Sequence, residues 1–134
     1  MTQFGKYTII DRLAMGGMAE LFLVKGETPG SPIVLKRLLP HLGEKSEFVT
    51  MFLDEARIAA NLNHPNIVHI YDIGKALGTY YIAMEFIHGA DLMDICRHGI
   101  KQKNFLPMRH AVKVISQVSE GLMYAHDHED ESGM

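Results

Sequence analysis

Residues 13–36 of the chain read LAMGGMAELFLVKGETPGSPIVLK. The pattern predicts a strand, a turn of small residues, a second strand, a loop and a third strand that ends near Lys36. Gly16 and Gly17 leave the turn nearly without side chains, so its backbone N–H groups can approach a ligand and point at anionic oxygens. Lys36 follows three apolar residues, and its charge needs a partner there. A phosphate group is such a partner. The turn alone is also compatible with an ordinary hairpin.

Composition narrows the classes of function. The chain has 134 residues, 47% hydrophobic and 22% charged, which is ordinary for one globular domain with a modest core. The net charge of −3 gives no basic surface, so we expect no nucleic-acid partner. Cys96 is the single cysteine and fits a reducing compartment, so we expect a cytoplasmic protein. We expect no signal peptide, no membrane segment and no metal ligands, because neither a long apolar run nor a Cys/His spacing occurs.

The periodicity of apolar residues predicts an α+β fold. Strands are expected at 7–13, 20–24 and 33–38, as an antiparallel meander with a loop at 26–32. A helix follows, with Ser46 as its cap, and ends before Pro65; its apolar positions are Phe48, Met51, Phe52, Ile58, Ala59 and Leu62. Strands at 67–71 and 79–87, the latter central, are separated by a turn at 74–78. The sheet would thus have five antiparallel strands with one helix on a face.

Two further helices are expected beyond the sheet, and they have no sheet of their own. The first is short and covers residues 90–96. The second begins near Pro107 and carries an apolar stripe with helical spacing, formed by Ala111, Ile115, Val118, Leu122 and Ala125. The polar residues 127–133 end this pattern.

Glu55, on the helix after the third strand, has two readings. It is either a plain surface carboxylate, or it faces the sheet and forms an ion pair with Lys36 that holds the ammonium group for nucleotide phosphates. The spacing of the residues alone does not choose between them.

Four segments in this order resemble a protein kinase domain. They are the turn and strand of residues 13–36, the helix with Glu55 and Ala56, the string HPNIV at 64–68, and the string IAMEFIHGADL at 82–92, which resembles the hinge between the two lobes. The first and third glycines of the family's G-x-G-x-x-G-x-V loop fall on Ala14 and Ala19, its second on Gly16 and its valine on Leu21. The run GGMAE is most similar to bacterial serine/threonine kinases.

The resemblance implies a role for each matching residue. The backbone of Ala14, Gly16, Gly17 and Ala19 would cover the phosphates, and Leu13, Leu21 and Val34 would roof the adenine. Lys36 would bind the α- and β-phosphates and Glu55 would hold Lys36. Met84 would be the gatekeeper, although a plain core residue fits its position equally well. The backbone of Glu85 and Ile87 would bind the adenine edge, and Asp91 would reach the ribose.

Several positions depart from the family pattern. Ala14 and Ala19 replace glycines and are tolerable if their φ angles stay negative. Val34 replaces the usual alanine and narrows the adenine slot slightly. The H-R-D-x-x-x-x-N and D-F-G motifs, which supply the catalytic base and the Mg²⁺ ligands, do not occur in the sequence. Asp127 is a poor substitute, because no arginine follows the preceding histidine.

The resemblance therefore implies a truncated kinase domain over 7–134, with the small lobe and hinge at 7–87 and the start of the large lobe at 88–134. ATP would be its ligand, with Mg²⁺ only in a complete domain, and a protein its substrate. The chain would be the ATP-binding part of a serine/threonine kinase, inactive by itself. A non-catalytic kinase-like module that binds a nucleotide or a partner is the first alternative. An inactive fragment whose last two helices expose apolar faces is the second.

Overall fold

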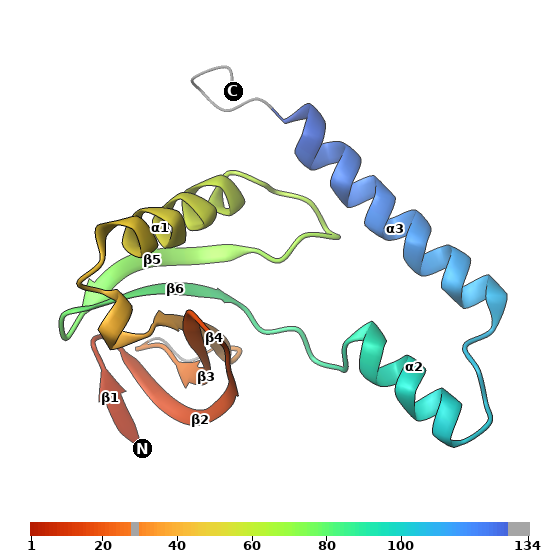
Figure 1. The fold of residues 1–134 in the computed structure, drawn as a ribbon, viewed down its shortest axis with the longest axis horizontal. Coiled ribbons are helices and arrows are strands. Elements are labelled where there is room, and N and C mark those ends of the chain that lie inside the picture. The colour runs from red at the N-terminus through yellow and green to blue at the C-terminus, as the bar shows by residue number, and fades with distance from the viewer. Residues whose placement is uncertain (28–29, 129–134) are drawn as a thin grey trace. The chain divides into compact units, whose positions relative to one another are not determined.

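The computed structural model describes residues 1–27 and 30–128, which form two compact units. The first unit comprises Met1–Asn63 and Val68–Phe86, and the second comprises His64–Ile67 and the chain from Ile87 on. Thr28 and Pro29 of the expected 26–32 loop, and most of the expected polar tail at 127–133, lie outside the described residues. The first unit holds a curled sheet with one helix, and the second holds two helices (Figure 1).

Six antiparallel strands form the sheet, in the order β1-β2-β3-β4-β6-β5. Their bounds are Thr2–Phe4 for β1, Tyr7–Met15 for β2, Ala19–Lys25 for β3, Ile33–Leu38 for β4, Ile70–Ala76 for β5 and Thr79–Glu85 for β6. The meander β2-β3-β4 and the interior position of β6 are confirmed. β1 is one strand more than the sequence predicts, because three residues are too few to show an alternating pattern.

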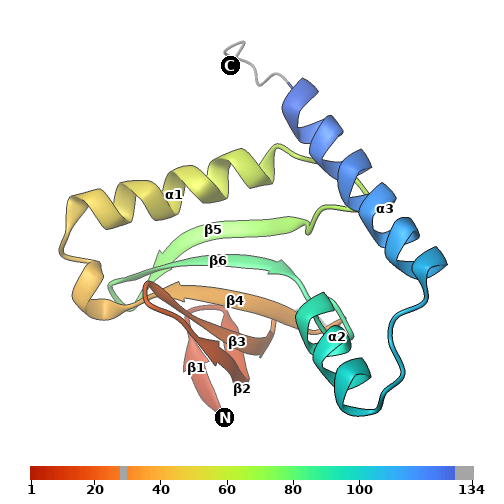
Figure 2. The ribbon, with the colours of Figure 1, turned by 45° about the vertical axis from the view of Figure 1, so that its right-hand side comes forward.

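Side chains alternate between the two faces of each strand, and each face carries its own apolar cluster. One cluster holds Phe4, Tyr7, Phe22, Val24, Leu35, Tyr81 and Ala83. The other holds Ala19, Leu38, Leu39, Leu42, Phe52, Ala56 and Ile82. The second cluster packs under α1 (Ser46–Ala60), which lies over the β5 and β6 side of the sheet (Figure 2). Leu35 belongs to the cluster on the face away from α1. Its chain neighbour Lys36 therefore points to the opposite face, toward α1.

The start of α1 differs from the prediction. The helix is preceded by a 3₁₀ turn at Pro40–Leu42, and its N-cap is Lys45, whose extended backbone has φ −99° and ψ 108°. Ser46 as the cap is therefore wrong, because this residue already has helical geometry and no side-chain cap bond is made. Met51 and Ile58, two of the expected apolar positions, are exposed.

The β5–β6 hairpin also differs from the expected bounds. β5 begins at Ile70, because the chain before it turns at His64, whose carbonyl accepts from Ile67 N at 3.1 Å. The expected turn at 74–78 is shorter, since Gly74 still belongs to β5. Only Leu77 and Gly78 form the turn, with φ angles of 49° and 77°. Two consecutive residues with positive φ match the twist of a two-residue hairpin.

The second unit contains α2 (Leu92–Lys101) and α3 (Met108–Asp127). α2 is longer than expected, and Asp91 caps it by accepting from Asp94 N at 2.8 Å. Asn66 is tied to α3, because its Nδ2 donates to Gln117 O at 2.9 Å. Ile115, Val118 and Leu122 of the predicted stripe are at least half exposed. Among the described residues, no helix has the length and apolar character needed to span a bilayer.

Candidate functional site

Lys36 on β4 and Glu55 on α1 form the ion pair that the sequence allows. Lys36 Nζ donates to Glu55 Oε1 at 2.9 Å. The Lys36 side chain is 26% exposed and the Glu55 side chain is 60% exposed. Glu55 is thus both a partly solvated carboxylate and the partner of Lys36. The pair leaves the remaining ammonium donors of Lys36 available for a ligand.

A cavity of about 260 Å³ lies beside this pair, within the first unit. Its walls are mostly apolar, and among the described residues that line it Lys36 and Glu55 carry charges. The lining comprises Leu21, Lys36, Glu55, Ala56, Ala59, Val68, Ile70, Ile82 and Met84. Apolar walls with one cation fit a flat aromatic group joined to an anionic one.

Five of these lining residues were not predicted from the sequence as site residues. Ala59 follows Glu55 by one helical turn, which would have placed both on one face of α1. Ile82 lies opposite Lys36 in the β4–β6 register, and Ile70 lies opposite Met84. Ile70 and Ile82 could thus be identified only from the pairing of the strands, and a single segment of sequence does not show which residues are paired.

The turn after β2 is closed by Gly16 N, which donates to Ala19 O at 2.9 Å. Met18 O accepts from Leu39 N at 2.9 Å, so the turn is also attached to the end of β4. Neither Ala14 nor Ala19 is among the described residues with positive φ, as the replacement of glycine requires. A Cβ built on Gly17 would meet nothing within 4 Å, so the backbone is open to a ligand at this position.

The other predicted site residues are not among those that line the cavity. Leu13 is exposed on β2, Val34 is buried on β4 opposite Met84, and Ala19 is buried in the cluster under α1. Glu85 N donates to His69 O at 2.9 Å, so of its two backbone groups the carbonyl is the candidate for a ligand. Ile87 and Asp91 belong to the second unit, where Asp91 caps α2.

A second polar cluster is centred on Asp72 of β5. Its Oδ2 accepts from Tyr81 Oη at 2.9 Å and Tyr7 Oη at 3.1 Å, and lies 2.7 Å from Lys6 Nζ. Burial would raise the pKa of Asp72, but the three hydrogen bonds outweigh it and lower that pKa. Burial and the Asp72 carboxylate raise the pKa of Tyr7 to about 12. This cluster is not part of the cavity lining.

The described residues contain no group of three or more His, Cys, Asp or Glu side chains arranged to hold a metal ion. The site beside Lys36 offers electrostatic and positional chemistry. It has one oriented ammonium group, one open backbone turn and an apolar wall.

A curled antiparallel sheet with one helix, joined by a lysine–glutamate pair, is the architecture of a kinase small lobe. The family model of the protein kinase domain matches residues 7–129, and the chain belongs to the protein kinase family. The fold prediction is thereby confirmed.

Relatives and solved structures that resemble the chain are also protein kinases. The tyrosine-protein kinase MasK of Myxococcus xanthus is 41% identical over 133 residues, which cover 97% of this chain and 21% of MasK. The serine/threonine-protein kinase PrkC of Bacillus subtilis is 31% identical, with 93% and 19% covered. The PknI kinase domain of Mycobacterium tuberculosis superposes with a TM-score of 0.73 and 30% identity, covering 93% of this chain and 49% of that domain. The chain thus spans about half of that solved kinase domain and about a fifth of these two curated relatives.

Proposed function

We propose that the chain is the ATP-binding part of a protein kinase that transfers the γ-phosphate of ATP to protein hydroxyl groups. The observation that carries this proposal is the 2.9 Å pair of Lys36 and Glu55 at the edge of the cavity. In phosphoryl transfer the protein acts chiefly by positioning and by electrostatic stabilisation. A strand lysine held by a helical carboxylate supplies both to the α- and β-phosphates.

Each site residue then has a proposed role. Lys36 binds the phosphates, Glu55 orients Lys36, and the backbone of Ala14, Gly16, Gly17 and Ala19 covers the phosphates. Leu13, Leu21 and Val34 roof the adenine, and Met84 closes the cavity behind it. The Glu85 carbonyl and the backbone of Ile87 bind the adenine edge, and Asp91, which also caps α2, reaches the ribose.

We propose a kinase domain over 7–134, with the small lobe and hinge at 7–87 and the first part of the large lobe at 88–134. Mg²⁺ supplies charge neutralisation of the phosphates in a complete kinase. The sequence contains neither H-R-D nor D-F-G, so we assign no magnesium ligand and expect the chain alone to bind ATP without transferring phosphate. Cys96 is free and exposed, which supports a cytoplasmic location.

Serine and threonine are the proposed acceptor residues, as in the names of most of the relatives compared. The name of MasK makes tyrosine the second candidate. Phosphoamino-acid analysis of protein labelled by the complete kinase distinguishes them. Phosphoserine or phosphothreonine is the expected product, and phosphotyrosine alone would overturn this assignment.

Nucleotide binding is tested by thermal unfolding of the chain with ATP and with adenosine. A ligand at 100 times its Kd stabilises the folded state by about 2.7 kcal/mol, so a rise in Tm is expected with ATP. Adenosine, which lacks the phosphates, should give a smaller rise at the same concentration. A Tm that does not respond to ATP would overturn the proposal. A chain that binds ATP but stays inactive within its complete protein would instead support the non-catalytic module.

A further inference from the structure

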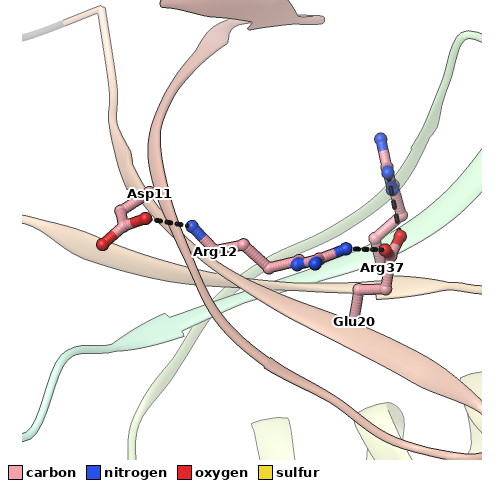
Figure 3. A network of polar contacts seen from close by, with 4 residues as sticks. All are labelled: Asp11, Arg12, Glu20 and Arg37. Atoms are coloured by element: carbon pink, nitrogen blue, oxygen red, sulfur yellow. Dashed lines mark hydrogen bonds and ion pairs between the residues drawn. The ribbon is translucent and has the colours of Figure 1, made fainter.

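Glu20 is the one charged residue that the described part of the chain buries, with 8% of its surface exposed. Its Oε2 accepts from Arg37 Nη2 at 2.9 Å, and its Oε1 lies 3.6 Å from Arg12 Nη1 (Figure 3). Arg12 N in turn donates to Asp11 Oδ1 at 2.8 Å. We call Arg12, Glu20 and Arg37 the arginine clamp. It lies on the face of the sheet opposite Lys36, so it does not line the cavity.

The clamp connects the three strands that carry the phosphate-binding elements. Arg12 is on β2, just before the glycine turn, and Glu20 on β3 follows the turn directly. Arg37 on β4 is opposite Glu20 in the register and is the chain neighbour of Lys36. One carboxylate therefore joins both sides of the turn to the backbone that carries the lysine.

The guanidinium group of Arg37 is held on several sides. It lies 4.7 Å from the centroid of the Phe22 ring and 5.4 Å from that of Phe4. Its Nε is buried and has no hydrogen-bond partner. Burying charges and an unpaired donor is costly, and apolar replacements of such pairs are often neutral or stabilising. Stabilisation of the fold thus does not explain well why these charges are buried. A role in fixing the geometry of the turn explains it directly.

We infer that Glu20 is a positioning residue, which holds the turn of residues 14–19 at a fixed place relative to Lys36 and so raises affinity for the phosphates of ATP. The inference rests on the proposed nucleotide site. Glu20 touches no ligand and acts through the turn and β4. Small displacements of groups that position a ligand have large effects, because the bound geometry is narrow.

The test measures the Kd values of ATP and adenosine by isothermal titration for the full chain and three variants. Glu20→Gln removes the charge that both arginines bind. Arg12→Gln separates β2 from the clamp and is safe for folding, because the Arg12 side chain is mostly exposed. Asp72→Asn is the matched control, since the polar partners of this carboxylate are Lys6, Tyr7 and Tyr81 rather than residues of the clamp.

Glu20→Gln should raise the Kd of ATP about tenfold, the equivalent of one lost charge-assisted bond, and change that of adenosine less than about twofold. Arg12→Gln should act in the same direction with a smaller factor. Asp72→Asn should lower Tm but leave the ratio of the two Kd values unchanged. Hydrogen exchange at Gly16 N–H should become faster in Glu20→Gln and stay unchanged in Asp72→Asn.

Two results would overturn the inference while leaving the nucleotide site intact. One is wild-type ATP affinity in both clamp variants. The other is a parallel loss of ATP and adenosine affinity, which indicates a general loss of structure. If Glu20→Gln does not fold, the ratio of the ATP Kd to the adenosine Kd in Arg12→Gln tests the inference instead. An unaltered chain that binds no ATP would instead overturn the proposed function and this inference with it.

Discussion

Glu55, which we propose orients Lys36, is a mostly exposed carboxylate. An ion pair of this exposure contributes less than about 1 kcal/mol to folding, because water screens both charges. The pair with Lys36 is therefore a poor source of stability. It restricts the ammonium group to one position beside the cavity, so its loss should be visible in ligand binding.

Glu55→Gln should weaken ATP binding with little change in Tm. We expect a rise in Kd of about three- to tenfold, because Lys36 keeps its charge and loses its orientation. Asp54→Asn is the matched control on the same helix, since Asp54 pairs with Arg57 at 3.3 Å. Isothermal titration measures both variants. Equal ATP affinities in the two would contradict the role of Glu55.

The Asp72 cluster predicts how stability depends on pH. The pKa of Asp72 in the folded chain lies below its ordinary 3.8, so its contribution is present above that value and is lost as the pH falls through the lower folded pKa. The pKa of Tyr7 rises from 10.0 to about 12, so its contribution is present below pH 10 and is lost as the pH rises toward 12.

Urea unfolding at a series of pH values measures these two losses. The unfolding free energy of the wild type should fall on the acid side and again on the alkaline side. Asp72→Asn should remove the part of the fall in unfolding free energy at acid pH that Asp72 causes. Tyr7→Phe should reduce the fall in unfolding free energy at alkaline pH. Wild-type slopes in both variants would show that other groups control the pH dependence.

At the scale of elements, β1 lies before the residues that match the kinase family and still contributes to the core. Phe4, 2% exposed, packs edge to face on Tyr81, with ring centroids 5.8 Å apart. The turn that follows uses Gly5, whose φ of 55° suits glycine. β1 thereby closes the face of the sheet that carries the arginine clamp.

Phe4→Ala should destabilise the chain by about 3 kcal/mol, because it opens a cavity in a filled cluster. Phe105→Ala removes the same side chain from a position that is 67% exposed, and it should change stability by less than about 0.5 kcal/mol. Chemical unfolding of both variants provides the comparison. Similar small losses would mean that β1 is not part of the folded core.

Much of the order of strands and helices follows from the sequence. The elements and contacts that could not be predicted have physical reasons. The bounds of β4 were predicted because an apolar, β-branched run lies between turn formers. The Lys36–Glu55 pair needed the family resemblance, since spacing left Glu55 undecided. β1 is too short to show a pattern, and the N-cap of α1, which makes no side-chain bond, is Lys45 rather than the expected Ser46. Arg12, Glu20 and Arg37 read as scattered charges until the strand register brings them to one face.

At the scale of the whole molecule, two compact units differ in how much apolar surface they bury. The first has two filled clusters, one on each face of its sheet. In the second, α3 exposes Ile115, Val118 and Leu122, and α2 exposes Met93 and Ile100. Folding of this chain therefore removes less apolar surface from water than its length would suggest.

Urea unfolding should accordingly be shallow. The m-value scales with the surface that unfolding exposes, and we expect about 1 kcal/mol/M, the low end for small proteins. Circular dichroism at equilibrium measures it. A steep transition of about 2 kcal/mol/M or more would contradict the exposure of the α2 and α3 faces in solution.

Lys36 is proposed to bind the phosphates of a nucleotide in the cavity beside α1. Isothermal titration of ATP and adenosine into the wild-type chain and Lys36→Met measures this binding. The substitution should raise the Kd of ATP by about tenfold or more, which corresponds to the loss of a charge-assisted bond, and should leave adenosine binding nearly unchanged. Equal ATP affinity in the two proteins would contradict this role of Lys36.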